Sequence, residues 1–358
     1  MISAPSAQPP WPALDCRDWP DPFDAFPVAA PVEVKPDLVK IAPADWLRVD
    51  RQWQPMLAEK LDAHRADTHT AQGSRIALAT GCGPVIEQRR IAALARAVAA
   101  LAGSTAGRAL GIEATRAHAA GPLPRQVADR FGFRFGAAGY QVAGAAGRIR
   151  WTPVRGDAQA LAPVMRRQRG ALRLLTALAM SLQEDLVLME RTADAAVRAA
   201  LLHVSFPSAW DPGAKLGQDL VALHAPVADN AALQAAAGRL GNALVEKGPF
   251  VRWVWTVTTD CRWRAWPPSS SGSRCDTGSG NADGASRPDL YFRVERQTTM
   301  PLGDGYGLFL IRVLVRPLNE VLAMGGRREL LQAALMSMSE EMIRYKNLRE
   351  VRRLLFGR

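Results

Sequence analysis

The chain has 358 residues, of which 48% are hydrophobic and 22% are charged, a composition that supports a folded core and excludes a wholly disordered protein. Its four cysteines are too few for a small disulfide-stapled fold, and no uninterrupted apolar run reaches the roughly 18 residues that span a bilayer. The net charge of +11 comes almost entirely from arginine, because only six of the 45 basic residues are lysine. These arginines are scattered and accompany no aromatic strand motif or zinc knuckle, so nucleic-acid binding is not expected.

The beginning of the chain is rich in proline and shows little periodicity. We expect residues 1–35 to form a loose arm around the body of the protein. The first residues have neither the basic region nor the apolar stretch of a secretory signal, which favours a cytoplasmic location. We interpret residues 36–358 as a single domain, in which a low-complexity stretch at 267–288 predicts a flexible insertion.

Helical patterns dominate the first half of this domain. The spacing of apolar residues predicts a helix over about 43–66 with Asp45 as its N-cap, a second over 85–101 and a third over 166–183. The other residues between 71 and 165 have weak periodicity, and we predict no further element there.

Strand patterns take over after residue 184. Five stretches rich in Val, Ile, Phe and Trp predict strands at 185–190, 199–206, 250–258, 290–298 and 307–315. We expect the last two to pair in antiparallel fashion through a turn at residues 303–305. Helices are predicted over 230–247 and 329–345, the latter followed by a basic tail. The fold class is therefore α+β, with N-terminal helices, an antiparallel sheet of about five strands and a C-terminal helix.

Several familiar cofactor motifs are missing from the sequence. There is no GxGxxG or Walker A pattern for nucleotide phosphates, and there is no GxSxG elbow. Cysteines 16, 82, 261 and 275 lack the CxxC spacing of zinc or iron–sulfur sites.

The five histidines differ in their surroundings. His64 and His69 lie in a polar helical stretch and are expected on the surface. His203 lies within a predicted strand, whereas His224 ends a short apolar run just before Pro226, where one ring nitrogen is free to face a cavity. The residues alone leave both a structural and a ligand role open for His224.

Charged residues gather beside the predicted strands. Glu184 and Asp185 stand where the third helix meets the first strand, and Lys215 lies in a turn that also contains Trp210. These positions at element ends make the four side chains candidates for a site.

The segment RVERQT alternates charge along a strand. Arg293 and Glu295 are expected on one face and Arg296 on the other. Charges on a half-buried strand are unfavourable unless they meet partners or a charged ligand. A solvent-facing edge strand explains the pattern equally well.

Taken together, five motifs resemble the haem-dependent oxidative N-demethylase family, whose best-known activity is dimethylamine monooxygenase, in its haem-bearing oxygenase subunit. In chain order they are QEDLVLME (183–190), FPSAWDPGAKLG with LHAPV (206–227), the tryptophan-rich strand (250–258), LYFRVERQT (290–298) and EEMIRYKNL (340–348). The opening segment PADWLRVDRQWQPMLAEK is also similar to that family. The resemblance covers about residues 36–65 and 168–350.

The resemblance implies a PAS-like domain that binds haem b, which suits an antiparallel sheet. It implies His224 as the axial ligand of the iron, because this residue lies in a matched motif, with His203 as the alternative. The other residues that it assigns are Lys215, Arg293 and Arg296 for the haem propionates, and Glu184, Asp185 and Glu295 for the charge of a cationic amine.

The implied reaction is the oxidation, by O2, of the N-methyl group of a small secondary or tertiary alkylamine, which yields formaldehyde and the demethylated amine. Electrons would come from a separate flavin or iron–sulfur reductase, and the basic surface suits an acidic partner. Neither a membrane nor a nucleic-acid partner is implied, and an oligomer is compatible with this function. The alternative is a non-catalytic haem-PAS sensor or ligand-binding protein, but the sequence shows no pattern of an output domain.

Overall fold

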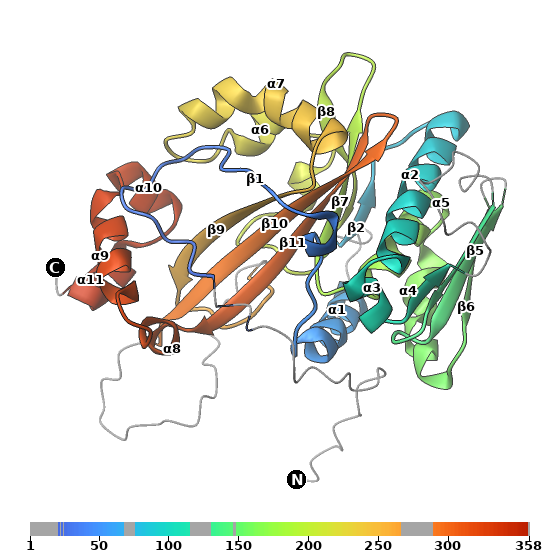
Figure 1. Ribbon diagram of the computed structural model, residues 1–358, viewed down its shortest axis with the longest axis horizontal. Helices are drawn as coiled ribbons and strands as arrows, with labels where there is room; N and C mark the ends of the chain where they lie inside the picture. Colours follow the sequence, from blue (N-terminus) through green and yellow to red (C-terminus); the bar gives the residue numbers. More distant parts are fainter. Residues whose placement is uncertain are drawn as a thin grey trace, which may run out of the picture.

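The computed structural model describes residues 21, 23, 25–67, 76–114, 130–145, 148–265 and 289–356. Two antiparallel sheets and the helices around them make up this part of the chain (Figure 1), which confirms the α+β class. The predicted insertion at 267–288 and the first part of the predicted arm lie outside the described residues. In order across the larger sheet, the seven strands are β1 (Val39–Lys40), β9 (Phe250–Thr258), β10 (Tyr291–Gly303), β11 (Tyr306–Pro317), β7 (Asp185–Arg191), β8 (Val197–His203) and β2 (Ala77–Ala79). The four of the smaller sheet are β3 (Ile112–Ala114), β4 (Arg130–Phe135), β5 (Tyr140–Ala145) and β6 (Arg148–Pro153).

The long hairpin of β10 and β11 forms the centre of the larger sheet. Its pairing starts with Tyr291 opposite Pro317 and ends at a turn made by Gly303, Asp304 and Gly305. All three turn residues have positive φ, of 79°, 55° and 79°, a conformation that glycine adopts without a steric penalty. The predicted antiparallel pairing through this turn is confirmed, and all five predicted strands are present.

Helices cover one side of the larger sheet, which we call the first face. Near β7 it carries Leu186, Leu188 and Leu310, which share a core with α2 (Pro84–Ala102) and α5 (Gly170–Ala179). The small sheet packs on the other side of these two helices, and α3 (Thr105–Ala109) and α4 (Ala162–Arg167) lie beside it (Figure 1). The two helices α2 and α5 therefore form the middle layer between the two sheets.

The same first face is covered at its other end by the last four helices. Phe292 and Val294 of β10 and Leu314 of β11 pack against residues of α8 (Leu318–Leu322), α9 (Arg327–Ser337), α10 (Glu340–Tyr345) and α11 (Arg349–Phe356). Phe23 and Val28 of the N-terminal segment join this core. The described part of the predicted arm therefore packs against the body of the protein.

The opposite side of the larger sheet, the second face, is covered less evenly. Val187 and Met189 of β7 pack against α6 (Leu220–His224) and α7 (Ala231–Glu246). On β9 and β10, by contrast, Arg252, Val254 and Glu295 are only partly buried. This part of the second face is where a ligand could reach the sheet.

Several predicted helices have different bounds in the structure. Asp45 belongs to a short 3₁₀ turn (Pro43–Asp45), and α1 begins at Trp53 and ends at Asp67, so the predicted N-cap is wrong. The third predicted helix is divided into α4 and α5, because Gln168 is extended and Gly170 has a φ of 50°. No helix among the described residues has both the length and the apolar character needed to cross a membrane.

The C-terminal part also departs from the prediction. The helix expected over 329–345 is broken between α9 and α10, where Met338 is extended and the side chain of Ser339 caps α10 by accepting a hydrogen bond from the Met342 amide. The expected basic tail forms α11.

The small sheet is the largest element missing from the sequence prediction. Its strand β4 alternates Phe131, Phe133 and Phe135 with polar or small residues. The next strands, YQVAGA and RIRWTP, mix strand-favouring residues with Gly, Ala, Arg and Pro. Their composition therefore gives only a weak strand signal, and their pairing completes the sheet.

Close contact between the hairpin and α7 gives a first prediction. A Cβ atom added at Gly307 would overlap the carbonyl oxygen of Leu244 and lie 3.1 Å from its carbonyl carbon. We expect Gly307→Ala to lower the free energy of unfolding by about 1–3 kcal/mol. Gly238 lies in α7 with nothing within 4 Å of such a Cβ, so Gly238→Ala should raise it by about 0.5–1 kcal/mol. Urea unfolding of both variants measures these changes, and equal effects would contradict the packing described.

Candidate functional site

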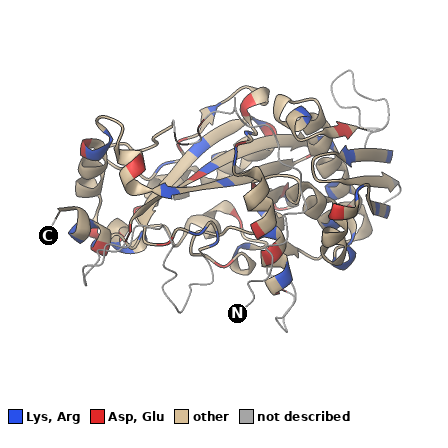
Figure 2. Cartoon of the chain, turned by 90° about the horizontal axis from the view of Figure 1, so that it is seen from below, with Lys and Arg blue, Asp and Glu red and all other residues tan. Residues whose placement is uncertain are grey.

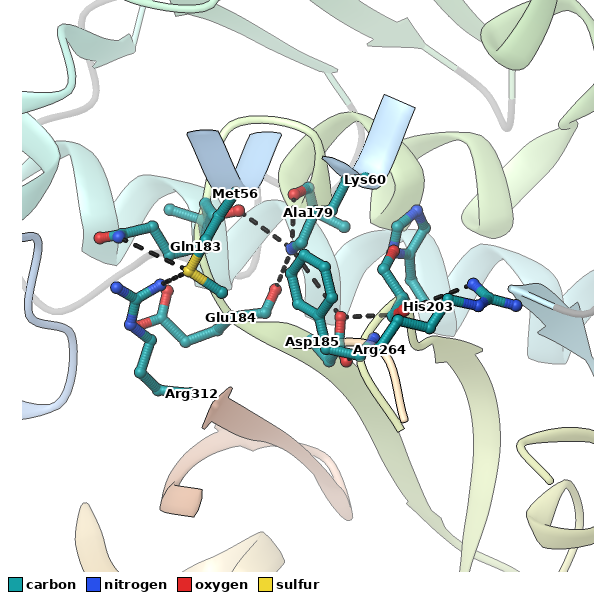
Figure 3. Close-up of polar contacts among 12 residues, drawn as sticks. Met56, Lys60, Ala179, Gln183, Glu184, Asp185, His203, Arg264 and Arg312 are labelled. Atoms are coloured by element: carbon teal, nitrogen blue, oxygen red, sulfur yellow. Dashed lines mark hydrogen bonds and ion pairs between the residues drawn. The ribbon is translucent and has the colours of Figure 1, made fainter. Parts of the chain in front are cut away.

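Most of the charged residues that the sequence singled out lie in two regions. One is a buried group at the start of β7, the Lys60 cluster, which we define as Lys60, His64, Glu184, Asp185 and His203. The other is the partly buried area of the second face near α6. Figure 3 shows the first region, where α1, the end of α5, the start of β7 and the loop after β8 converge.

Lys60 is fully buried, and its ammonium group binds backbone oxygens. Nζ donates to the carbonyls of Ala179, Leu182 and Glu184 at 3.1, 3.0 and 2.5 Å (Figure 3). It also lies 3.9 Å from Oδ1 of Asp185. Burial lowers the pKa of Lys60 to about 8, and the negative charges of Asp185 and Glu184 partly oppose this change. Lys60 thus joins α1 to the turn between α5 and β7.

Asp185 connects this turn to the loop that follows β8. Its two carboxylate oxygens accept hydrogen bonds from the amides of Ser205 and Phe206, at 2.8 and 2.7 Å. Glu184, the other predicted carboxylate, is also buried, and its Oε1 has no hydrogen-bond partner among the described residues. Burial raises the pKa of both carboxyl groups. The structure brings the two carboxylates together with Lys60, but inside the protein.

Two histidines complete the Lys60 cluster. Nε2 of His64 lies 2.9 Å from Nε2 of His203, so one ring donates to the other. Burial lowers the pKa of His64 to about 3 and that of His203 well below its usual value, and nearby positive charges act in the same direction. The expectation that His64 lies on the surface is wrong, since only 3% of it is exposed.

The burial of these residues follows from the periodicity of α1. The buried positions of this helix include 53, 56, 57, 60, 61, 64 and 67, a spacing of three and four residues that defines one helical face. Lys60 and His64 occupy core positions of this pattern despite their polarity. This spacing is the signal in the sequence from which the burial of Lys60 and His64 could have been predicted.

Arg293 and Glu295 share the second face, as predicted, and Ser208 bridges them. Ser208 Oγ accepts a hydrogen bond from Arg293 Nε at 2.8 Å and donates one to Oε1 of Glu295. The terminal nitrogens of Arg293 donate to the carbonyls of Phe206, Arg262 and Trp263. The guanidinium is therefore fully engaged by two loops, and Glu295 is the group of this pair that stays partly exposed.

Arg296 points to the first face and is separated from Arg293 by the strand itself. It donates to the backbone oxygens of Asp45 and Trp46 and lies over the ring of Trp253, 5.9 Å from its centroid. Burial lowers its pKa to about 10. Arg296 holds the N-terminal segment against the sheet and does not join the other predicted cofactor residues.

His224 lies at the end of α6, beside the second face. Its Nδ1 is 2.7 Å from the Leu220 carbonyl one turn earlier, so Nδ1 carries the proton and Nε2 presents a lone pair. Partial burial lowers the pKa of His224, and the positive charges of Arg252 and Lys215 add to this effect. Lys215 Nζ donates a long bond of 3.4 Å to the Leu223 carbonyl. His224 is therefore a neutral imidazole with one nitrogen directed away from its own helix.

Arg252 is a site residue that the sequence analysis missed. It lies on the same face of β9 and β10 as Glu295, one residue pair away, opposite Gln297. Its Nε is buried without a hydrogen-bond partner among the described residues, and the charge of Glu295 opposes the lowering of its pKa by burial. It lies in the tryptophan-rich strand that is one of the five matched motifs, but neither the alternation of that strand nor the resemblance assigned it a role.

The second region thus gathers His224, Lys215, Arg252 and Glu295. The apolar core that α6 and α7 form with β7 and β8 has partly buried side chains at its border, namely Trp210, Leu216, Leu223 and Phe309. Glu184, Asp185 and His203 lie in the Lys60 cluster, and Arg296 lies on the other face. The candidate residues predicted from the sequence therefore do not form one site, because some lie on the second face and others lie in the Lys60 cluster.

The Lys60 cluster yields a prediction about stability. Lys60→Met removes the cation beside Asp185 and the donor to three carbonyls, and breaking a buried ion pair by removing one partner costs roughly 3–5 kcal/mol. The double variant Lys60→Met/Asp185→Asn should recover part of this loss.

The same variant gives a pH dependence with a definite sign. The folded-state pKa of Lys60, about 8, is below the ordinary 10.5, so between these values the folded protein binds fewer protons than the unfolded chain. Raising the pH from about 8 to about 10 should therefore stabilise the wild type relative to Lys60→Met. Urea unfolding at several pH values measures the difference in free energy of unfolding between the wild type and Lys60→Met. A difference that does not change with pH, together with an unchanged stability of the variant at neutral pH, would contradict the burial of Lys60.

Comparison with known proteins places these residues in a family. The family described as haem-dependent oxidative N-demethylase, alpha subunit-like, matches residues 147–356. A comparison with curated proteins finds no match. The matched span includes β6 to β11, α6 and all of the residues gathered on the second face. It is more than half of the 358 residues, and the chain therefore belongs to the haem-dependent oxidative N-demethylase, alpha subunit-like family.

Proposed function

We propose that this chain is a haem-dependent monooxygenase that demethylates a small secondary or tertiary amine of the dimethylamine type. The observation that carries the proposal is His224, a neutral imidazole held through Nδ1 beside an open part of the sheet. Family membership supports the haem dependence and the oxidative N-demethylation in general. The substrate, the b-type haem and the PAS-like role of the larger sheet are our proposals.

The residues near His224 fit a haem. An axial histidine needs one ring nitrogen free and the other fixed by a hydrogen bond, as in His224. Among the described residues, Arg252 has a buried nitrogen without a partner, and the bond from Lys215 to the Leu223 carbonyl is long, at 3.4 Å. These two cations would hold the propionates, and the apolar side chains of Trp210 and Phe309 would contact the ring.

His203 fits the ligand role less well. Its Nε2 is occupied by His64 at 2.9 Å, and the residue is completely buried. Arg293 and Arg296 are likewise engaged by backbone carbonyls. We therefore assign these three residues to the framework, and we assign Lys215 and Arg252 to the cofactor.

Glu295 is our candidate for the group that receives the cationic amine. Ser208 and Gln297 each donate to one of its carboxylate oxygens, with 2.8 Å for the Gln297 bond. These neutral donors fix the position of the carboxylate, whose charge also acts on Arg252, Arg293 and Lys346, and its partly buried place would let it bind an alkylammonium ion. Asp185 acts indirectly, because its bonds to the Ser205 and Phe206 amides shape the loop that carries Ser208.

The overall reaction sets what the site must do. The amine, O2, two electrons and two protons give the amine hydroxylated at the methyl carbon and water, and this product splits into formaldehyde and the demethylated amine. Haem supplies the iron at which O2 is activated when it is bound. The chain's own residues hold the axial nitrogen, the propionates and the ammonium group, and a separate flavin or iron–sulfur reductase supplies the electrons.

The ligand assignment is tested by haem titration. We expect His224→Ala to lose the Soret band of the bound, histidine-ligated haem, because the axial nitrogen is gone. Val221→Ala changes an exposed residue of the same helix and should bind haem like the wild type. A Soret band of unchanged position and intensity in His224→Ala would rule out His224 as the ligand.

The role of Glu295 is tested with the haem-loaded enzyme. Loss of a hydrogen-bonded charge costs roughly 1.5–3 kcal/mol, so Glu295→Gln should raise KM for dimethylamine about tenfold or more without reducing haem content. Glu329→Gln removes an exposed carboxylate on α9 and should leave KM unchanged. An unchanged KM in Glu295→Gln contradicts the assignment. Haem binding without any turnover of amines by the wild type would favour the sensor alternative.

A further inference from the structure

The small sheet has two chemically different sides. Phe131, Phe133 and Phe135 of β4 point inward with Tyr140 and Val142 of β5, and they pack into the core around α2 and α5. The alternate positions point outward and are exposed. Among them are four arginines, Arg130 and Arg134 on β4 and Arg148 and Arg150 on β6.

Strand pairing places these arginines close to one another. Arg130 and Arg148 both pair with Ala145, so they lie in one row two strand spacings apart, about 10 Å. Arg150 follows Arg148 on the same side of β6, about 7 Å further along the strand. Figure 2 shows basic residues in blue on the strands at the end of the molecule remote from the C-terminus.

The centre of this surface carries no large side chain. Arg150 pairs with Ala143, which pairs with Gly132 on β4. The four arginines therefore stand around a shallow area made by Gly132 and Ala143. We call the surface formed by Arg130, Arg134, Arg148 and Arg150 and this area the arginine face.

The charges of the arginine face are not neutralised within the described part of the chain. None of the four arginines makes a side-chain hydrogen bond or ion pair there, although Glu113 stands opposite Arg134 in the strand register. Exposed arginines elsewhere in the fold do have acidic partners, such as Arg65 with Asp62 and Arg353 with Glu350. Like charges repel one another even across an intervening strand, so four arginines on one face, unpaired among the described residues, carry a free-energy cost that an external anion would offset.

We propose that the arginine face is a docking surface for an acidic segment of a partner protein. Arginine binds carboxylates in a bidentate manner, and four such groups around a shallow area fit a chain of Asp and Glu residues. The exposed positions present no aromatic side chain on which bases could stack, because the phenylalanines and Tyr140 face the core. A protein partner is therefore favoured over a single-stranded nucleic acid.

The position of the arginine face separates it from the proposed haem site. Figure 1 shows β5 and β6 beyond α2 and α5, whereas α6 lies over the larger sheet. Strands β3, β4 and β5 lie outside the matched residues 147–356. The partner docked here would thus hold the chain in an assembly without covering His224, and this inference does not depend on the proposed catalysis.

The test compares two variants with the same change in charge. In the first, Arg130, Arg134, Arg148 and Arg150 become Gln. In the second, four exposed arginines from other surfaces become Gln, namely Arg239, Arg328, Arg344 and Arg349. The probe is fluorescent poly-L-glutamate, titrated by anisotropy at low and at physiological salt concentration, with single- and double-stranded oligonucleotides as competing probes.

We expect the first variant to weaken polyglutamate binding about tenfold or more and the second to weaken it less than about threefold. Equal weakening by both variants would show a response to net charge alone and would overturn the proposal. Preferential loss of oligonucleotide binding by the first variant would overturn it in favour of nucleic acid.

A lysine version separates charge from geometry. Replacing the same four arginines by Lys keeps the charge but removes bidentate binding, so polyglutamate affinity should fall several-fold while the thermal unfolding midpoint stays the same. Full affinity in this version would show that the arrangement of guanidinium groups is not recognised and would contradict the docking surface.

Discussion

The buried ammonium group of Lys60 is the contact on which the arrangement of the site depends. It donates to three carbonyl oxygens at the end of α5 and in the turn that follows, where the last carbonyls of a helix have no partner within the helix. Its charge faces Asp185, which in turn holds the amides of Ser205 and Phe206. The loop fixed in this way delivers Ser208 to Arg293 and Glu295. A charge deep in the core thus determines where a carboxylate stands on the second face.

The side chains of strand β10 make different contacts on the two faces of the sheet. On the second face Arg293 ties down the loops around Phe206 and Trp263, while Glu295 remains partly exposed between Ser208 and Gln297. On the first face Arg296 binds the N-terminal segment. The strand is therefore both a wall of the proposed ligand site and a tether for three segments that are remote in sequence. Stiffness of this kind keeps a partly buried carboxylate in one position.

The sequence was sufficient for features that depend on local periodicity. The alternation of β10 correctly assigned Arg293 and Glu295 to one face and Arg296 to the other, and the GDG turn identified the hairpin. It was insufficient where contacts join distant segments. Nothing near Arg293 in the sequence shows that it meets carbonyls of two loops, and the polarity of Lys60 and His64 concealed their place in the core. Arg252 was missed because an orphaned nitrogen becomes visible only when its surroundings are known.

The contacts of the N-terminal segment also bear on how the chain assembles. Asp50 pairs with Arg312 at 2.5 Å, and Arg296 binds the Asp45 and Trp46 carbonyls, so these partners are separated by about 250 positions in the chain. Contacts of such long range close slowly, because the intervening loop must first be ordered. During synthesis on the ribosome, α1 therefore emerges long before the strands that neutralise its neighbours. Asp50, just before α1, therefore stays without its Arg312 partner until β11 has been made, whereas Lys60 of α1 can meet Asp185 as soon as β7 has emerged.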